Sequence, residues 1–134
     1  MTMLEFVNSL AAAILAFAAG AVWYMALAGP WKTASGVELD ADGNPQGGMS
    51  AGVMILTFVM QVVVAGMMRH VFAASGVETA GAGLVSGLGI GLFFIAPWIA
   101  INNANSMRPL TLTLIDGGYA TLACGLMGLV LTLF

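Results

Sequence analysis

Hydrophobic residues form four long blocks along the chain, and short polar stretches separate them. The blocks cover residues 6–28, 51–74, 79–101 and 109–134. Each block is long enough for a membrane-spanning helix, because a hydrocarbon core about 30 Å thick requires roughly 20 apolar residues in helical conformation. The pattern therefore predicts an all-α integral membrane four-helix bundle, with residues 1–134 forming a single transmembrane domain.

Turn-forming residues mark the boundaries of the blocks. Gly29 and Pro30 end the first block, since this pair stops a helix. The first polar connection is long, whereas residues 75–78 form a short turn, so blocks two and three are expected to be antiparallel neighbours. Pro97 is expected to kink block three. An even number of spans places both termini on the same side of the membrane.

Composition and charge support the membrane assignment. The chain is 60% hydrophobic and 7% charged, with a mean hydropathy of +1.02, whereas soluble domains carry about 25% charged residues. A water-soluble fold could not cover this much apolar surface with so few polar groups. We therefore expect the apolar surface to face lipid. The net charge of −3 provides no basic face for nucleic acid. The single cysteine, Cys124, excludes an intramolecular disulfide.

Motifs for metals and for catalysis are missing from the sequence. Asp40, Asp42 and Asn44 resemble the opening of a calcium-binding loop, but Pro45 stands where that loop needs glycine. The methionines of block two do not place three thioethers on one stripe, so a copper site is not indicated. We find no Ser-His-Asp set, phosphate-binding glycine loop or paired histidine motif. We therefore expect no metal and no cofactor.

Asp116 is the one charged residue well inside an apolar block. An ionised carboxylate at this depth costs several kcal/mol, so it should face the bundle interior and find a partner or a proton. Tyr119 lies one turn further along the same face and can donate a hydrogen bond, and Arg108 could extend toward Asp116 from two turns back. These three residues are the candidate ligand or proton site. The alternative is a structural cluster of hydrogen bonds.

Other polar residues lie within the blocks or at their ends. Asn8 and Gln61 are expected to form hydrogen bonds between helices. The expected anchors at the membrane–water interface are Trp23, Tyr24, Trp31, Arg69, His70 and Trp98. Arg69 and His70 could also bind a lipid phosphate. His70 and Asp116 belong to opposite ends of the bundle, so a direct pair within one subunit is not expected.

Small residues recur every four positions in three of the blocks, where they allow helix backbones to approach closely. The stripes are Ala12, Ala16 and Gly20 in block one, Gly83, Gly87 and Gly91 in block three, and Gly117, Thr121 and Gly125 in block four. The stripes predict helix packing within one chain. The stripe of block three could also form the seam of a homo-oligomer, and the two interpretations are compatible.

Three stretches of the chain carry a family resemblance. They are Asn8 with the alanine-rich first block, the run from Gly20 to Lys32 with two Trp-containing motifs, and the run from Leu114 to Tyr119 before Met127 and Gly128. In these stretches the chain resembles a family of small four-span membrane proteins of bacteria and fungi that is known only as a domain of unknown function. The resemblance implies a four-helix fold and no particular activity. It makes five positions the motif-bearing ones: Asn8, Trp23, Tyr24, Asp116 and Tyr119.

Three classes of function remain open. We expect a small homo-oligomeric transporter, channel-like protein or ligand-binding bundle with its polar site around Asp116, in contact with membrane lipid and with a small ligand of unknown identity. The alternative is a non-catalytic assembly module that packs through the glycine ridges, and an enzyme acting on a lipid or quinone is the least favoured. We expect a bacterial inner membrane location, and Lys32 and Arg108 slightly favour the first and third connections as cytoplasmic.

Overall fold

A computed structural model describes residues 1–46 and 50–134 of the chain. Its elements are α1 (Met3–Ala26), α2 (Ala28–Ser35), α3 (Ala51–Ser75), α4 (Ala80–Ile90), the π-helical turn η1 (Gly91–Ile95), α5 (Ala96–Asn105) and α6 (Leu110–Leu131). The segments α4, η1 and α5 form one continuous helix, so the described residues contain four helices long and apolar enough to cross a membrane. The prediction of an all-α membrane bundle is confirmed.

Hydroxyl side chains start three of the long helices. Thr2 accepts a hydrogen bond from the Glu5 N–H at 3.2 Å while Glu5 accepts one from the Thr2 N–H, which completes a capping box before α1. Ser50 and Thr79 cap α3 and α4 in the same way through a backbone N–H three residues later. Gly76 ends α3 in the left-handed conformation with φ +71°, which favours glycine at this position.

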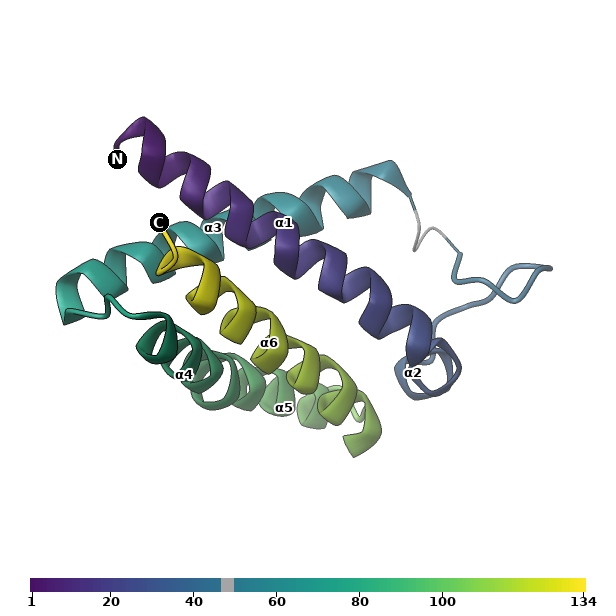
Figure 1. Ribbon diagram of the computed structural model, residues 1–134. Coiled ribbons are helices and arrows are strands. Elements are labelled where there is room, and N and C mark those ends of the chain that lie inside the picture. Colours follow the sequence, from purple (N-terminus) through teal and green to yellow (C-terminus); the bar gives the residue numbers. More distant parts are fainter. Residues whose placement is uncertain (47–49) are drawn as a thin grey trace.

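The helix α6 is the centre of the bundle, and every other helix contacts it (Figure 1). Its most extensive partner is α4, whose glycines face the α6 backbone directly. A Cβ atom on Gly83 would lie 2.3 Å from the Gly128 carbonyl oxygen, and one on Gly87 would lie 2.1 Å from the Cys124 carbonyl oxygen. The glycine stripe of block three is therefore used within one chain. A homo-oligomer would have to use a different face.

The helix α1 packs on α6 through its alanines. Ala12 and Ala16 are fully buried in a core that also contains Met68 and Met127. Gly20 leaves room for the Tyr119 ring, because a Cβ atom there would lie 2.6 Å from the Tyr119 hydroxyl oxygen. All three residues of the first small stripe thus serve contacts inside the chain.

The helices α3 and α4 are not the packed neighbours that the short turn between them suggested. Although residues 76–79 join them, α3 contacts α1 and α6, and in the described residues it makes no extensive contact with α4 or α5 (Figure 1). The reason is side-chain size. The glycines of α4 let it lie directly on α6, whereas α3 carries Val, Met and Phe side chains along most of its length. The two helices diverge from their turn.

The expected kink at Pro97 takes the form of the wide turn η1. Here the Ala96 N–H donates to the Gly91 carbonyl, five residues earlier, in place of the usual four. Pro97 follows directly and has no N–H to donate. Gly91 still faces Ala120 and Thr121 of α6, and Ala96 faces Gly117 one turn later. The contact between the two helices therefore continues past the proline.

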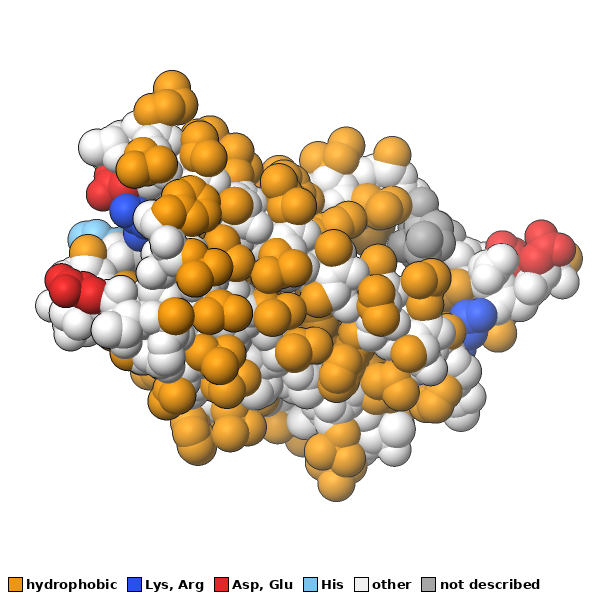
Figure 2. All heavy atoms as spheres, viewed as in Figure 1, with side chains coloured by type: hydrophobic (Ala, Val, Ile, Leu, Met, Phe, Trp, Pro, Cys, Tyr) orange, Lys and Arg blue, Asp and Glu red, His pale blue; other side chains and the backbone are white. Residues whose placement is uncertain are grey.

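Charged side chains gather at the two ends of the bundle, with hydrophobic side chains covering the surface between them (Figure 2). Both ends of the chain lie at one end of the bundle, and the connection from α2 to α3 lies at the other (Figure 1). This distribution is that of an integral membrane protein, since a bilayer solvates apolar side chains in the middle and charged groups on either side.

Candidate ligand-binding cleft

A cleft of about 410 Å³ lies where α3 diverges from α5, with α6 as its floor. This volume falls within the range of about 300–1,000 Å³ that is usual for small-molecule pockets. Polar side chains line the cleft from four helices: Tyr24, Gln61, Asn102, Asn103, Asp116 and Tyr119. The remaining wall is mostly apolar, formed by Val64, Ile95, Ile99, Ala120, Ala123, Cys124 and Met127. The cleft thus combines a polar cluster with a hydrophobic wall.

The carboxylate of Asp116 is held by Tyr24 from α1. The Tyr24 hydroxyl donates to Asp116 Oδ1 at 2.7 Å. The Tyr24 ring is itself fixed by edge-to-face contacts with Trp31, at a centroid distance of 6.1 Å, and with Tyr119, at 5.3 Å. Asp116 is part-buried and lies about 9 Å along α6 from its first residue. A rigid aromatic cluster therefore positions one oxygen of a carboxylate at membrane depth.

Tyr119 does not donate to Asp116, although the sequence suggested that it could. Its hydroxyl donates to the Ala16 carbonyl at 2.6 Å and accepts a hydrogen bond from Gln61 Nε2 at 2.7 Å. A hydroxyl has one proton, and here Ala16 receives it, so the Gln61 atom facing Tyr119 must be the amide nitrogen. Among the described residues, Gln61 Oε1 is then left buried without a hydrogen-bond partner. The hydroxyl oxygen of Tyr119 therefore links α6, which carries Tyr119, to α1 and to α3.

Arg108 is directed away from Asp116. Its guanidinium donates to the Ser35 carbonyl at the end of α2, so it ties the third connection to the first. Trp23 also acts within the bundle, because its indole N–H donates to the Ile115 carbonyl of α6 at 3.0 Å. As a result, no Lys, Arg or His is found among the described residues that line the cleft. Tyr24, rather than Arg108, is the residue that the structure places beside Asp116.

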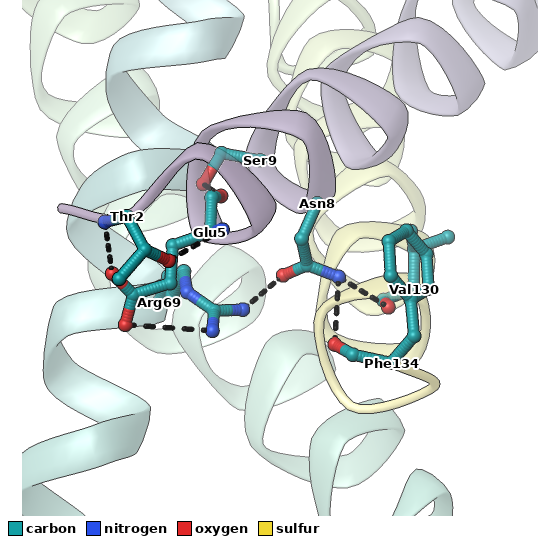
Figure 3. A network of polar contacts seen from close by, with 7 residues as sticks. All are labelled: Thr2, Glu5, Asn8, Ser9, Arg69, Val130 and Phe134. Atoms are coloured by element: carbon teal, nitrogen blue, oxygen red, sulfur yellow. Dashed lines mark hydrogen bonds and ion pairs between the residues drawn. The ribbon is translucent and has the colours of Figure 1, made fainter.

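A second polar network lies at the opposite end of the bundle (Figure 3). Asn8 is fully buried and donates to the carbonyls of Val130 and Phe134, both at 3.2 Å, where α6 ends. It also accepts a hydrogen bond from Arg69, whose guanidinium lies 3.7 Å from the Glu5 carboxylate. Asn8 therefore fastens α1 to the end of α6 and to the residues after it, where the Val130 carbonyl also accepts from the Leu133 N–H at 3.1 Å.

The other residues expected to anchor the bundle at the membrane–water interface differ in their solvent exposure and in their contacts. Arg69 and His70 line a cavity of about 380 Å³ beside Glu5, and Arg69 is part of the network with Asn8 and Glu5. Trp98 is 63% exposed on α5, in keeping with a ring that faces lipid or headgroups. His70 lies at the end opposite the Asp116 cleft, as its position in α3 suggested.

Comparison with protein families gives one match. A family model described as "Protein of unknown function (DUF1761)" matches residues 7–132. The chain belongs to this family. The resemblance drawn from the sequence motifs is thereby confirmed, and the match includes Asn8 and every residue of the cleft. No curated protein and no solved structure matches the chain.

The cleft offers hydrogen-bond acceptors and aromatic faces. In the part of the chain that the structure describes, no group of three or more His, Cys, Asp and Glu side chains is placed to hold a metal ion. The Asp40 carboxylate in the first connection accepts hydrogen bonds from the backbone N–H groups of Asp42 and Asn44, at 2.9 and 3.0 Å, and so stabilises its own turn. The chemistry that the cleft supports is binding of a proton or of a positively charged or hydrogen-bond-donating group.

Sequence reasoning missed two features of the cleft. Tyr24 was interpreted as an interface ring, yet its hydroxyl is the partner of Asp116. Gly20 was interpreted as a packing residue only, yet it opens the space for the Tyr119 ring. One signal was available for Tyr24, because the end of α1 and the start of α6 lie on the same side of the membrane, which places Tyr24 and Asp116 at similar depths.

Proposed function

We propose that this protein is a small membrane-embedded bundle that binds a proton or a small ligand at Asp116 and acts as a transporter or channel-like protein. The observation that carries the proposal is a carboxylate at membrane depth that lines a cleft of about 410 Å³. Tyr24 bonds one of its two oxygens. We propose that the other oxygen, which lies on a carboxylate that also has the Trp31 indole beside it, takes the proton or the ligand.

The charge balance of the cleft supports a cationic occupant. A carboxylate away from water is costly unless a proton, a cation or several hydrogen bonds compensate it. No basic side chain lines the cleft among the described residues, and Arg108 is bonded to Ser35 instead. A proton or a bound cation would supply the missing charge. This requirement distinguishes the cleft from a structural ion pair such as Arg69 with Glu5.

The divergence of α3 from α5 supports ligand access. Helices in a bundle normally close on each other, and here the cleft separates α3 from α5, the far part of the continuous helix that a short turn joins to α3. Four spans are few for a transport path, so we propose that the chain works as a homo-oligomer. Its glycine ridges are used internally, so the contact between copies would involve outer apolar faces. We also propose a bacterial inner membrane location, with the first and third connections cytoplasmic.

Thermal unfolding of the purified protein in detergent tests the proposal. The native chain, Asp116→Asn and the control Glu78→Gln are compared across pH and with Na⁺, K⁺ and ammonium salts. Glu78 is an exposed carboxylate in the turn between α3 and α4. A cation at about 100 times its dissociation constant should stabilise the native chain by about 2.7 kcal/mol. This gain should persist in Glu78→Gln and disappear in Asp116→Asn.

The alternative function has its own outcome in the same experiment. If Asp116→Asn is less stable under every condition and no variant responds to pH or cations, Asp116 is a structural group. The protein would then be a non-catalytic assembly module, in which the Asp116–Tyr24 bond fastens α1 to α6. An enzyme acting on a lipid or quinone has no support from the residues of the cleft.

A further inference from the structure

We infer that the cleft binds an organic ammonium group, R–NH₃⁺, whose apolar part R lies against the hydrophobic wall. The inference rests on the proposed function and specifies the class of ligand. The choice of an ammonium group follows from a comparison of the cleft's hydrogen-bonding groups: some already bond to partners within the protein, and others do not.

The donors of the cleft are largely committed to partners within the protein. Tyr24 donates to Asp116, Tyr119 donates to Ala16, and Gln61 donates to Tyr119. Asn103 donates to Thr113 at 3.1 Å. Asn102 also lines the cleft, and its side-chain amide donates no hydrogen bond within the described residues. A carboxylate or a phosphate would therefore find donors at Asn102 alone, unless it broke the bonds of the other residues. It would also meet the negative charge of Asp116.

Acceptors remain available beside these committed donors. Tyr24 provides the one hydrogen bond of ordinary geometry to Asp116 in the described residues, with the Trp31 indole beside the same carboxylate, and Gln61 Oε1 is buried without a partner there. An ammonium group has three donors and no acceptor, so it matches this imbalance in both charge and hydrogen bonding. The rings of Tyr24 and Tyr119 lie beside the carboxylate and offer π faces that attract a cation.

The apolar wall indicates that the ammonium carries a hydrophobic substituent. Below the polar cluster the cleft continues past Val64, Ile95 and Met127. A bare alkali ion or NH₄⁺ would leave this part of the cavity without contacts. Each methylene of an alkyl chain that enters it should improve binding by up to about fourfold, until the cavity is full.

A series of ligands against the native protein provides the test. Dissociation constants are measured by calorimetry in detergent for ethyl-, butyl- and hexylammonium. Three further probes each lack one property of butylammonium: tetramethylammonium has no N–H donor, butanol has no charge, and butyrate has the opposite charge. We expect affinity to rise along the alkylammonium series. We also expect butylammonium to bind at least tenfold more tightly than the three other probes, since a hydrogen bond to a charged group is worth about that factor or more.

Two variants separate binding at the cleft from partition into the micelle. Asp116→Asn should abolish the saturable binding, whereas Glu78→Gln should leave it unchanged. Gln61→Met keeps the length of the side chain but removes the unpaired acceptor together with the hydrogen bond to Tyr119. It should weaken butylammonium about tenfold, whereas tetramethylammonium, which makes no N–H bond to the acceptor, should report only the effect of losing the Tyr119 bond. The ligand series on the native chain does not depend on either variant folding.

The outcomes distinguish this inference from the proposed function. If protons or alkali cations bind at Asp116 while alkylammonium ions do not, the inference is overturned and the proposed function stands. Equal affinity for tetramethylammonium and butylammonium would also overturn it, because N–H donors would then play no part. If the native chain and Asp116→Asn bind every probe alike, the proposed function fails as well.

Discussion

Replacing Gly87 with alanine tests the central contact of the bundle, where α4 lies against α6. The added Cβ atom would lie 2.1 Å from the Cys124 carbonyl oxygen and 2.9 Å from the carbonyl carbon. Ordinary contacts between such atoms begin near 3.4 Å. The two helices would therefore have to separate locally by more than about 1 Å, a gap at which each atom pair loses roughly a quarter to a half of its dispersion energy.

The expected loss of stability is large because the obstacle is backbone and not a flexible side chain. Overpacking of a close contact costs about 1–3 kcal/mol. The contact of α4 with α6 is the most extensive in the bundle, so the upper part of that range is expected. Alanine favours the helix over glycine by about 0.5–1 kcal/mol, which offsets only part of this cost.

Gly89→Ala is the matched control, because Gly89 lies on the same helix and a Cβ atom there would meet nothing within 4 Å. We expect Gly89→Ala to be as stable as the native chain or slightly more stable. Both variants are unfolded in detergent by heat and by denaturant, at two protein-to-detergent ratios. The loss in Gly87→Ala should not change with that ratio, because the contact lies within one chain.

Two results would refute the reasoning. Equal stability of Gly87→Ala and Gly89→Ala would mean that α4 does not lie on α6 at this distance. A loss in Gly87→Ala that appears only at high protein-to-detergent ratio would mean that the glycine stripe joins separate copies of the chain.

Three further experiments test other features of the structure. Asn8→Leu should cost about 1–3 kcal/mol, because it removes the buried hydrogen bonds of Asn8 to two carbonyls at the end of the chain and to the Arg69 guanidinium. Ser9→Ala, which removes a bond within α1 only, should cost less, and thermal unfolding compares the two variants. Tyr24→Phe and Asp116→Ala, each of which removes one partner of the bond, should show a coupling energy of about 0.5–3 kcal/mol in a double-mutant cycle, whereas simple additivity would contradict the hydrogen bond between them. Met107→Gly should raise the unfolding temperature, since Met107 is 91% exposed and has φ +58°, a conformation that costs a non-glycine residue about 1 kcal/mol or more.

The four spans could be predicted from the sequence because crossing a membrane imposes a length and a composition that local patterns reveal. The small-residue stripes were likewise visible, and their spacing indicated which faces approach other helices. Spacing alone did not show which helix would be the partner. The stripe with Gly87 was compatible with helix packing within one chain and with a contact between two copies of the chain, and only the position of α6 distinguished the two.

The candidate site was predicted in part. Asp116 was found because an isolated carboxylate in an apolar block is chemically conspicuous. Its partner Tyr24 lies 92 positions away, and no local pattern encodes a pairing over that distance. Tyr119 was placed correctly on the helix, but the direction of its hydroxyl depends on the space that Gly20 leaves on α1. Arg108 was misplaced because the Ser35 carbonyl competes for it.

The wide turn η1 has a consequence for comparing this chain with its relatives. Gly83, Gly87 and Gly91 are spaced by four residues, whereas Ala96, the next residue to face α6, follows after five. The turn thus behaves as a one-residue insertion that leaves the residues on both sides in register. A relative lacking one residue between 91 and 95 would keep the same contact with α6 in an unbroken α-helix. It would then lose the space that accommodates Pro97, so the extra residue and the proline are expected to be gained or lost together.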